Sequence, residues 1–265
     1  MTAASILEVT DLSKSFGGVE AVRKCSFTIE QGSITGLIGS NGAGKSTTVN
    51  LLSGFQRADS GEVRFAGESI MGRPPHQVAA RGLIRTFQTA REWGSLSVME
   101  NMLVAARAMG RDAAWRSLFR PRRIATAERD DREAARGILA DLGLVALRDD
   151  RAGELSGGQK RLLEFARIVM ARPQLALLDE PLSGVNPVLV ARISHAIEYL
   201  RQSGITLVIV EHNLTFVEQA CDTAIVMALG TVIASGTMNA LRKDPAVLDA
   251  YLGVDTSALG VDTSA

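Results

Sequence analysis

GSNGAGKST, residues 39–47, decides the fold of this chain. An apolar run ending at Ile38 leads into these residues, and a helix-compatible stretch beginning at Thr48 follows them, so the pattern predicts a strand, a glycine-rich turn and a helix. In this setting the backbone N–H groups of the turn converge on phosphate oxygens at the positive end of the helix. We therefore predict a phosphate-binding loop made of Gly39, Ser40, Asn41, Gly42, Ala43, Gly44, Lys45, Ser46 and Thr47.

Each residue type in this loop suits phosphate binding. The glycines adopt backbone angles that a side chain would forbid, Lys45 adds a positive charge, and the Ser46 hydroxyl can serve the Mg²⁺ ion that the phosphates carry. A helix terminus alone contributes about 0.3–1 kcal/mol, whereas micromolar nucleotide binding needs roughly 8 kcal/mol, so amides and lysine must act together. The alternative is a merely structural glycine turn. A dinucleotide-binding fingerprint fails because no third glycine follows Gly44 in the required place.

The composition excludes several classes of function. The chain has 265 residues, with Lys+Arg and Asp+Glu both at 29 and an aromatic content of 5%, so neither charge nor base-stacking residues point to nucleic acid. Cys25 and Cys221 lie far apart without the spacing of a metal site, which favours free thiols in a reducing compartment. The first residues carry charges where a signal peptide needs an apolar core, so we expect no export.

Residues 223–241 are uncharged and approach the length of a membrane-spanning helix, which is about 20 residues. Their glycines and β-prone residues instead predict two short strands around a turn at Leu229-Gly230. We therefore expect that another chain crosses the membrane if this protein works there.

The sequence of the N-terminal part predicts a small antiparallel β-sheet layer. Residues 6–9 and 26–29 read as strands separated by a glycine turn, and residues 63–65 as a further strand. Phe16, immediately before the glycine turn, can stack on a purine ring, an interaction worth about 0.5–1.5 kcal/mol beyond its buried area. Ordinary packing of this side chain is the alternative.

The middle of the chain changes from strand to helix. Residues 82–88 predict a strand that ends at Gln88, whose side chain could reach a bound metal ion or water. From residue 93 the pattern becomes helical, with helices expected at 99–109 and 128–142. Between them we predict an irregular, solvated basic loop around a proline, with contact to anionic lipid headgroups as the alternative; its charges are Arg116, Arg120, Arg122 and Arg123.

A second helix start with free amides lies at residues 155–159, which read LSGGQ. Ser156 is a good N-cap, and the next two glycines again free backbone N–H groups at the start of a helix. The chain therefore holds two anion-binding helix starts, and one nucleotide has no obvious need of both from one molecule.

Two buried strands end in polar residues. The apolar run 175–178 precedes Asp179-Glu180, and because successive strand residues point opposite ways, one carboxylate can face magnesium and the other the attacking water. Merely solvated acids are the alternative. Residues 206–210 form a second such strand, and since strand ends of a parallel sheet line the ligand crevice, His212 is expected near the phosphates.

Taken together in this order, these motifs resemble the ATP-binding subunit of an ABC transporter over nearly the whole chain; LSGGQ between the phosphate loop and the acidic strand end is the specific feature. The resemblance implies an α/β fold with a P-loop NTPase (ABC ATPase) core, an antiparallel β subdomain and an inserted α-helical subdomain at about residues 93–160. Residues 1–253 are then one ATP-binding domain, and residues 254–265 a flexible tail. LGVDTSA occurs twice at this end, at residues 252–258 and 259–265.

The resemblance also implies residue roles. Phe16 would stack on the adenine of ATP, and Ser46, Gln88 and Asp179 would serve Mg²⁺ directly or through water. Glu180 would act as the catalytic base or polarise the water, and His212 would sense the γ-phosphate. Two copies, identical or paralogous, would pack head to tail so that each closes over the ATP of the other with its Ser156, Gly157, Gly158 and Gln159.

The finer resemblance is to ATPases of branched-chain amino acid importers, through Glu211-His212, the SGVNP turn and the ending DPAVLDAYLG. It implies transmembrane permease subunits contacted through residues 91–95, a solute-binding protein, no nucleic acid, and a peripheral place at the cytoplasmic face of the inner membrane. An ATPase of a lipid or polysaccharide exporter and a soluble non-transport ABC ATPase are the alternatives. One departure is Asn186, where the family usually has an aspartate, so a salt bridge between the two sites is in doubt.

Overall fold

The computed structural model describes residues 4–86, 92–108, 121–185 and 187–252, which fall into two compact units. Unit 1 consists of Met1–Val78, Leu177–Pro181 and Thr206–Ala265, and unit 2 of Ala79–Ala176 and Leu182–Ile205. The phosphate loop and the acidic strand end thus belong to unit 1, and LSGGQ belongs to unit 2. The predicted limits of the single domain and of its helical subdomain stay predictions.

An antiparallel sheet forms the N-terminal part of unit 1, as predicted. Its strand order is β2-β1-β4-β5, and Phe16 pairs with Val19 across the glycine turn. The first two strands are longer than expected, because the ladder continues through polar, mostly exposed residues that lack the alternating apolar pattern. The strands are β1 (Ser5–Phe16), β2 (Val19–Glu30), β4 (Ser60–Phe65) and β5 (Glu68–Ser69).

A second sheet of unit 1 carries the ends of the buried strands, in the order β10-β9-β3-β8-β7. β3 pairs in parallel with both β8 and β9. Every residue of β3, β7 and β8 is buried, which explains their continuous apolar runs. The bounds are β3 (Ile34–Gly39), β7 (Leu175–Asp179, in unit 1 from Leu177 on), β8 (Thr206–Val210), β9 (Thr223–Ala228) and β10 (Thr231–Gly236).

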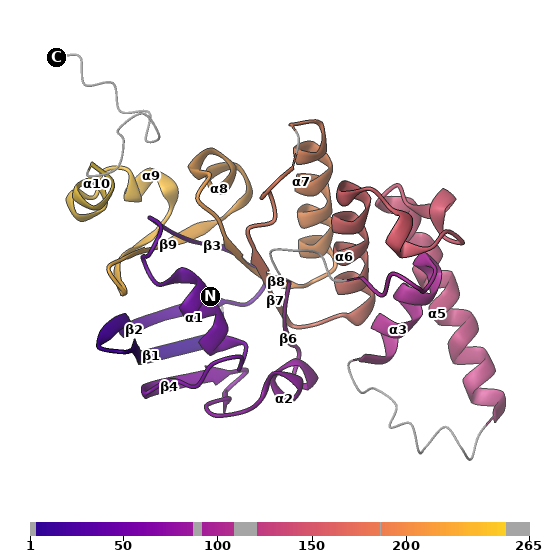
Figure 1. Cartoon of the computed structure of the whole chain (residues 1–265), viewed down its shortest axis with the longest axis horizontal. Helices are drawn as coiled ribbons and strands as arrows, with labels where there is room; N and C mark the ends of the chain where they lie inside the picture. Colours follow the sequence, from indigo (N-terminus) through magenta and orange to yellow (C-terminus); the bar gives the residue numbers. More distant parts are fainter. Residues whose placement is uncertain (1–3, 87–91, 109–120, 186, 253–265) are drawn as a thin grey trace. The chain divides into compact units, whose positions relative to one another are not determined.

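Short helices complete unit 1 (Figure 1). α1 (Lys45–Leu52) contacts β2 and β3, and α2 (Pro75–Ala80) begins in this unit. α8 (Leu214–Ala220) contacts β3, whereas α9 (Met238–Leu241) and α10 (Pro245–Leu252) contact β10. Apolar side chains of α8, α9 and α10 share one core cluster with residues of β3 and β9: Ile38, Leu214, Val217, Ala224, Val226, Met238, Leu241 and Val247.

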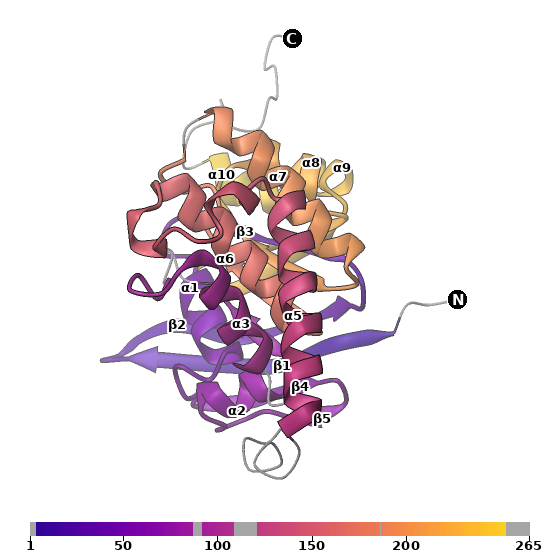
Figure 2. The same ribbon diagram turned by 90° about the vertical axis from the view of Figure 1, so that its right-hand side faces the viewer.

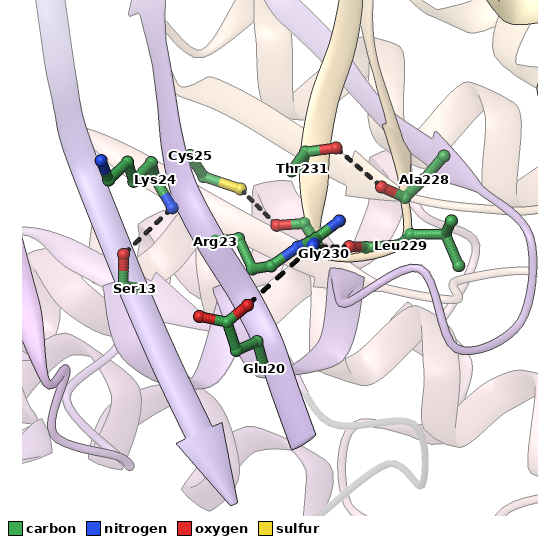
Figure 3. A network of polar contacts seen from close by, with 9 residues as sticks. All are labelled: Ser13, Glu20, Arg23, Lys24, Cys25, Ala228, Leu229, Gly230 and Thr231. Carbon is green, nitrogen blue, oxygen red and sulfur yellow. Dashed lines mark hydrogen bonds and ion pairs between the residues drawn. The ribbon is translucent and has the colours of Figure 1, made fainter. Parts of the chain in front are cut away.

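Residues 223–236 of the uncharged stretch form the predicted hairpin of β9 and β10, and its last residues form α9. Figure 3 shows how β2 holds its turn: the Arg23 backbone N–H and the Cys25 thiol both donate to the Gly230 carbonyl, at 2.7 and 3.1 Å. The Arg23 Nε–H donates to the Leu229 carbonyl at 3.2 Å. Among the residues that the structure describes, none of the helices is both long enough and apolar enough for a membrane crossing.

Unit 2 is mainly helical; α6 contacts α3, α5 and α7, and Figure 2 shows α3 and α5 along it. The prediction of an irregular segment at Arg122 and Arg123 was wrong, because both lie in a helix that begins at Pro121, a residue suited to the first helical position. Of the predicted strand 82–88, Leu83–Arg85 form a short strand, and residues 87 and 88 lie outside the described residues. The elements are β6 (Leu83–Arg85), α3 (Val98–Ala108), α5 (Pro121–Asp141), η1 (Val145–Leu147), η2 (Ala152–Glu154), α6 (Gly157–Ala171) and α7 (Pro187–Gln202).

We predict that Leu229→Asn stabilises the protein by about 1 kcal/mol, measured by chemical denaturation. Leu229 is 79% exposed and has φ of 46°, a left-handed angle that asparagine adopts more readily than leucine. Leu229→Ala is the control, because it removes the same side chain but keeps an unfavourable residue at this angle. An equal gain in both variants would contradict the backbone explanation.

Candidate functional site

The phosphate loop joins β3 to α1, and two close approaches require glycine there. Gly39 has φ of 153° and Gly44 has φ of 100°. A Cβ at Gly39 would collide with the Met227 carbonyl of β9, and one at Gly44 with the Ala21 carbonyl of β2. The loop is also bonded to the hairpin turn, because the Gly230 N–H donates to the Ala43 carbonyl at 3.1 Å. Both neighbouring sheets therefore hold the loop in its conformation.

Lys45 lies buried at the start of α1. Its Nζ donates to the carbonyls of Gly39 and Ser40, at 2.7 and 3.0 Å. Burial lowers the pKa of this lysine, while the negative charges of Glu180 and Asp179 act in the opposite direction. The ammonium group is thus folded against the loop and lies in the field of both acids at the end of β7.

The two acids differ in their surroundings. Asp179 is the buried last residue of β7. Glu180 is half-buried and has φ of 45°, a left-handed angle that is uncommon for a residue with a side chain. Its N–H donates to the Val210 carbonyl at the end of β8, at 3.0 Å. Such local strain costs of order 1–3 kcal/mol and persists only where the surroundings impose it, as at functional sites.

Glu211 and His212 follow the end of β8. Glu211 is buried, and its Oε2 accepts the His212 backbone N–H at 3.2 Å and lies 3.8 Å from the His212 Nδ1. The His212 side chain is 65% exposed. Asn213 then caps α8, because its side chain accepts the Phe216 N–H at 3.0 Å. The histidine side chain therefore faces solvent from a turn whose backbone is held by the Glu211 side chain before it and by the Asn213 cap after it.

Phe16 ends β1 in the antiparallel sheet and is 44% exposed. The Lys14 ammonium lies 5.4 Å from the centroid of its ring. Val19, its partner across the turn, is also exposed. An aromatic face of unit 1 is thus accessible, as base stacking requires.

In unit 2, Ser156 caps α6 as predicted. Its hydroxyl accepts the Gln159 N–H at 3.4 Å, and its own N–H donates to the Gln159 side chain at 2.8 Å, which makes a capping box. A Cβ at Gly157 would meet open space, whereas one at Gly158 would collide with Leu189 of α7. Packing against α7 within this chain thus explains why residue 158 is a glycine. Ser156 and Gly157 leave the start of α6 exposed.

An aromatic platform in unit 2 lies in the stretch expected to contact a permease. Trp93 is 41% exposed, and the Arg167 guanidinium of α6 lies 4.1 Å from its ring centroid. Glu92 forms an ion pair with Lys160, also of α6, at 2.8 Å. The buried Asn101 side chain bonds the Trp93 N–H and carbonyl, both at 3.1 Å. Both residues 92 and 93 are thus attached to the helix that begins with LSGGQ.

Comparison with known proteins identifies this arrangement. Residues 22–183 match the family model described as ABC transporter, and residues 231–256 match the one described as branched-chain amino acid ATP-binding cassette transporter. The chain belongs to the ABC transporter family. It is an ATP-binding cassette that hydrolyses ATP for a transporter.

The relatives of the cassette match over almost its full length. A probable branched-chain amino acid transport ATP-binding protein LivG of Archaeoglobus fulgidus is 40% identical, over 96% of this chain and 98% of the relative. The corresponding high-affinity protein BraF of Pseudomonas aeruginosa is 36% identical, over 94% and 98%. A solved ATP-binding cassette of an ABC transporter in its ADP conformation matches with a TM-score of 0.78 and 34% identity, over 95% and 100% of the two chains.

The structure describes most of the cassette's predicted site residues, whose roles stay predictions. The loop, Asp179, Glu180 and His212 follow the ends of strands of one sheet in unit 1. Gln88 and Asn186 lie outside the described residues, so their roles stay predictions. Sequence reasoning missed Lys14, whose position two residues before Phe16 on a strand was a signal, and Asp59, for which no signal existed.

Proposed function

We propose that this cassette drives the import of branched-chain amino acids, or of a related small polar solute, by hydrolysing ATP. The match of residues 231–256 to the branched-chain amino acid model carries the proposal, since this segment is separate from the ATP-binding match. The names of the relatives from Archaeoglobus and Pseudomonas support it.

Unit 1 would contact one ATP molecule at its phosphates and at its adenine base. The phosphate oxygens would lie at the loop, where the backbone amides, the start of α1 and the Lys45 ammonium all favour negative charge. The adenine would stack on the exposed face of Phe16. Supporting this, the two glycine approaches described above and the bond from Gly230 fix the backbone of the loop, and the Lys45 ammonium lies against its Gly39 and Ser40 carbonyls.

Mg²⁺ fits the donor set at the loop. Asp179 offers a carboxylate and Ser46 a hydroxyl, which are hard oxygen ligands, and magnesium is commonly held by one or two protein groups together with substrate phosphates. Asp179 acts electrostatically on Lys45, the neighbour of Ser46 in the chain, which supports its nearness to the loop. When bound, Mg²⁺ supplies positive charge that neutralises phosphate oxygens; Gln88 would complete its surroundings.

Glu180 would handle the attacking water. Its carboxylate would accept a proton as the water oxygen attacks the γ-phosphorus, and the bond to the leaving ADP oxygen breaks. The left-handed backbone and the hydrogen bond to β8 fix the backbone position from which this carboxylate extends. His212 would donate to the γ-phosphate from its exposed position, so that it distinguishes ATP from ADP.

A second ATPase subunit, identical or a paralogue, would complete each site. In a head-to-tail dimer, the N-terminus of α6 with Ser156, Gly157, Gly158 and Gln159 would approach the γ-phosphate held by the partner's loop. ATP would then favour the closed dimer, and loss of the γ-phosphate would reopen it. The capping box supports this role because it leaves the helix start ordered and exposed.

The cassette would work peripherally at the cytoplasmic face of the inner membrane, against transmembrane permease subunits that receive solute from a solute-binding protein. The exposed Trp93 ring would contact the permease. The links of Trp93 and Glu92 to α6 would transmit movement of the permease to the LSGGQ residues at the start of that helix. Units 1 and 2 would together act as the single ATP-binding domain of residues 1–253.

Glu180→Gln should bind ATP with Mg²⁺ but turn it over at least a hundredfold more slowly, because the amide cannot accept the proton. The bound ATP should then accumulate a dimer, detected by light scattering at saturating ATP. Lys45→Ala is the companion variant and should give neither hydrolysis nor dimer. A Glu180→Gln protein that stays monomeric in saturating ATP and Mg²⁺ would argue against the closure mechanism.

Ser156→Asp should separate capping from phosphate binding. Aspartate caps as well as serine, so the free energy of unfolding should change by less than about 0.5 kcal/mol. Its charge would repel the partner's γ-phosphate, so ATPase activity should fall at least tenfold. Ser156→Asn, a neutral cap of similar size, is the control and should retain clearly more activity. Full activity in the aspartate variant would rule out an approach of this residue to phosphate.

Co-purification from membranes in mild detergent tests the transport role. We expect two permease subunits, a second ATPase, and ATPase stimulation by a branched-chain amino acid receptor with its ligand. Trp93→Ala should reduce permease recovery, whereas Leu229→Ala, which removes an exposed apolar side chain of unit 1, should not. A lipid-exporting partner or no membrane partner would overturn the assigned purpose while leaving the ATP chemistry intact.

A further inference from the structure

We propose that Lys14 and Asp59 tune the base-stacking face of Phe16, so that the cassette binds a purine base more strongly than an isolated phenylalanine would. This inference rests on the proposed stacking of adenine on Phe16. It adds two positioning residues, one a cation over the ring and the other an acid that holds the cation there.

Lys14 and Phe16 lie on the same face of β1, because side chains two residues apart on a strand point the same way. The Lys14 Nζ is 5.4 Å from the ring centroid, within the range of about 6 Å over which a cation is attracted to an aromatic face. Its side chain is only 18% exposed. The ammonium is therefore partly removed from water and held at one face of the ring.

Asp59 fixes this cation from outside the strand, in the segment before β4. Its Oδ1 accepts from the Lys14 Nζ at 2.7 Å, and its Oδ2 accepts the Ser15 backbone N–H at 2.7 Å. Its own N–H donates to the Ser13 carbonyl at 2.9 Å. The hydrogen bond from Lys14 is the main cause of a lowered pKa of Asp59. Both oxygens and the backbone of one residue thus hold residues 13–15 next to Phe16.

A cation at one face draws π-electron density toward itself and leaves the opposite face less negative. An electron-rich purine then stacks on that opposite face with less repulsion between the two π-systems. We expect the change in stacking to be of the size of a cation–π contact at an exposed site, which corresponds to about a two- to fivefold change in a binding constant. Because pyrophosphate carries no base, this gain should be confined to ligands with a purine ring.

The test compares binding of ADP and of pyrophosphate by calorimetry to the full chain and to Lys14→Met, which keeps the length of the side chain without its charge. ADP should bind about two- to fivefold more weakly to Lys14→Met, with pyrophosphate unchanged. In a Phe16→Ala background, Lys14→Met should have no further effect on ADP. Asp59→Asn should weaken ADP in the same direction, because it releases the ammonium. Lys243→Met, an exposed position in unit 1, controls for net charge.

Each other outcome overturns the inference. Equal weakening of ADP and pyrophosphate would mean that Lys14 acts on phosphate. Unchanged ADP affinity would mean that the cation does not affect stacking, and tighter ADP binding that it occupies the face the base needs. An effect of Lys14→Met that persists without the Phe16 ring would exclude the ring as its route. By contrast, unchanged ADP binding to Phe16→Ala would refute adenine stacking itself, and so the proposed function of Phe16.

Discussion

The close approach of two backbone carbonyls to Gly39 and Gly44 is the constraint on which the rest of the site depends. The Met227 carbonyl of β9 and the Ala21 carbonyl of β2 occupy the places where side chains would begin, so the loop can be enclosed by two sheets and still present its amides. Lys45 folds back onto the loop carbonyls within this enclosure, next to the field of the acids at the end of β7. The loop carbonyls and the two acids thus act on the same lysine.

Much of this arrangement was predictable because it rests on local patterns. Mainly apolar runs marked β3, β7 and β8, since strands buried on both faces carry few polar residues, and Ser156 with its glycines marked the start of α6. Long-range pairings were not predictable. No period in the sequence indicates that Asp59 reaches Lys14, 45 residues before it, because this pairing depends on how two separate segments of the chain come together. The error at Arg122 had a local cause: Pro121 reads as a break, although it also suits a helix start.

Glu180 and Ser156 show two ways of preparing a residue for chemistry. Glu180 is held in a strained backbone by a bond to a neighbouring strand, and its position is therefore imposed by the sheet. Ser156 is held by an unstrained reciprocal cap within its own helix. The first residue cannot move without the sheet, whereas the second moves with its helix, as the proposed approach of Ser156 to a partner's nucleotide would require.

The turn between β9 and β10 bears on protein engineering. Hairpin tips are usually good places for inserted tags or circular permutation, because few contacts depend on them. Here the Gly230 carbonyl accepts from Arg23 and Cys25, and its N–H donates to Ala43 of the phosphate loop. An insertion at this tip would displace a support of nucleotide binding. The turn at Ala66-Gly67, where a side chain on the glycine would meet open space, is the better point for a label or a fused domain.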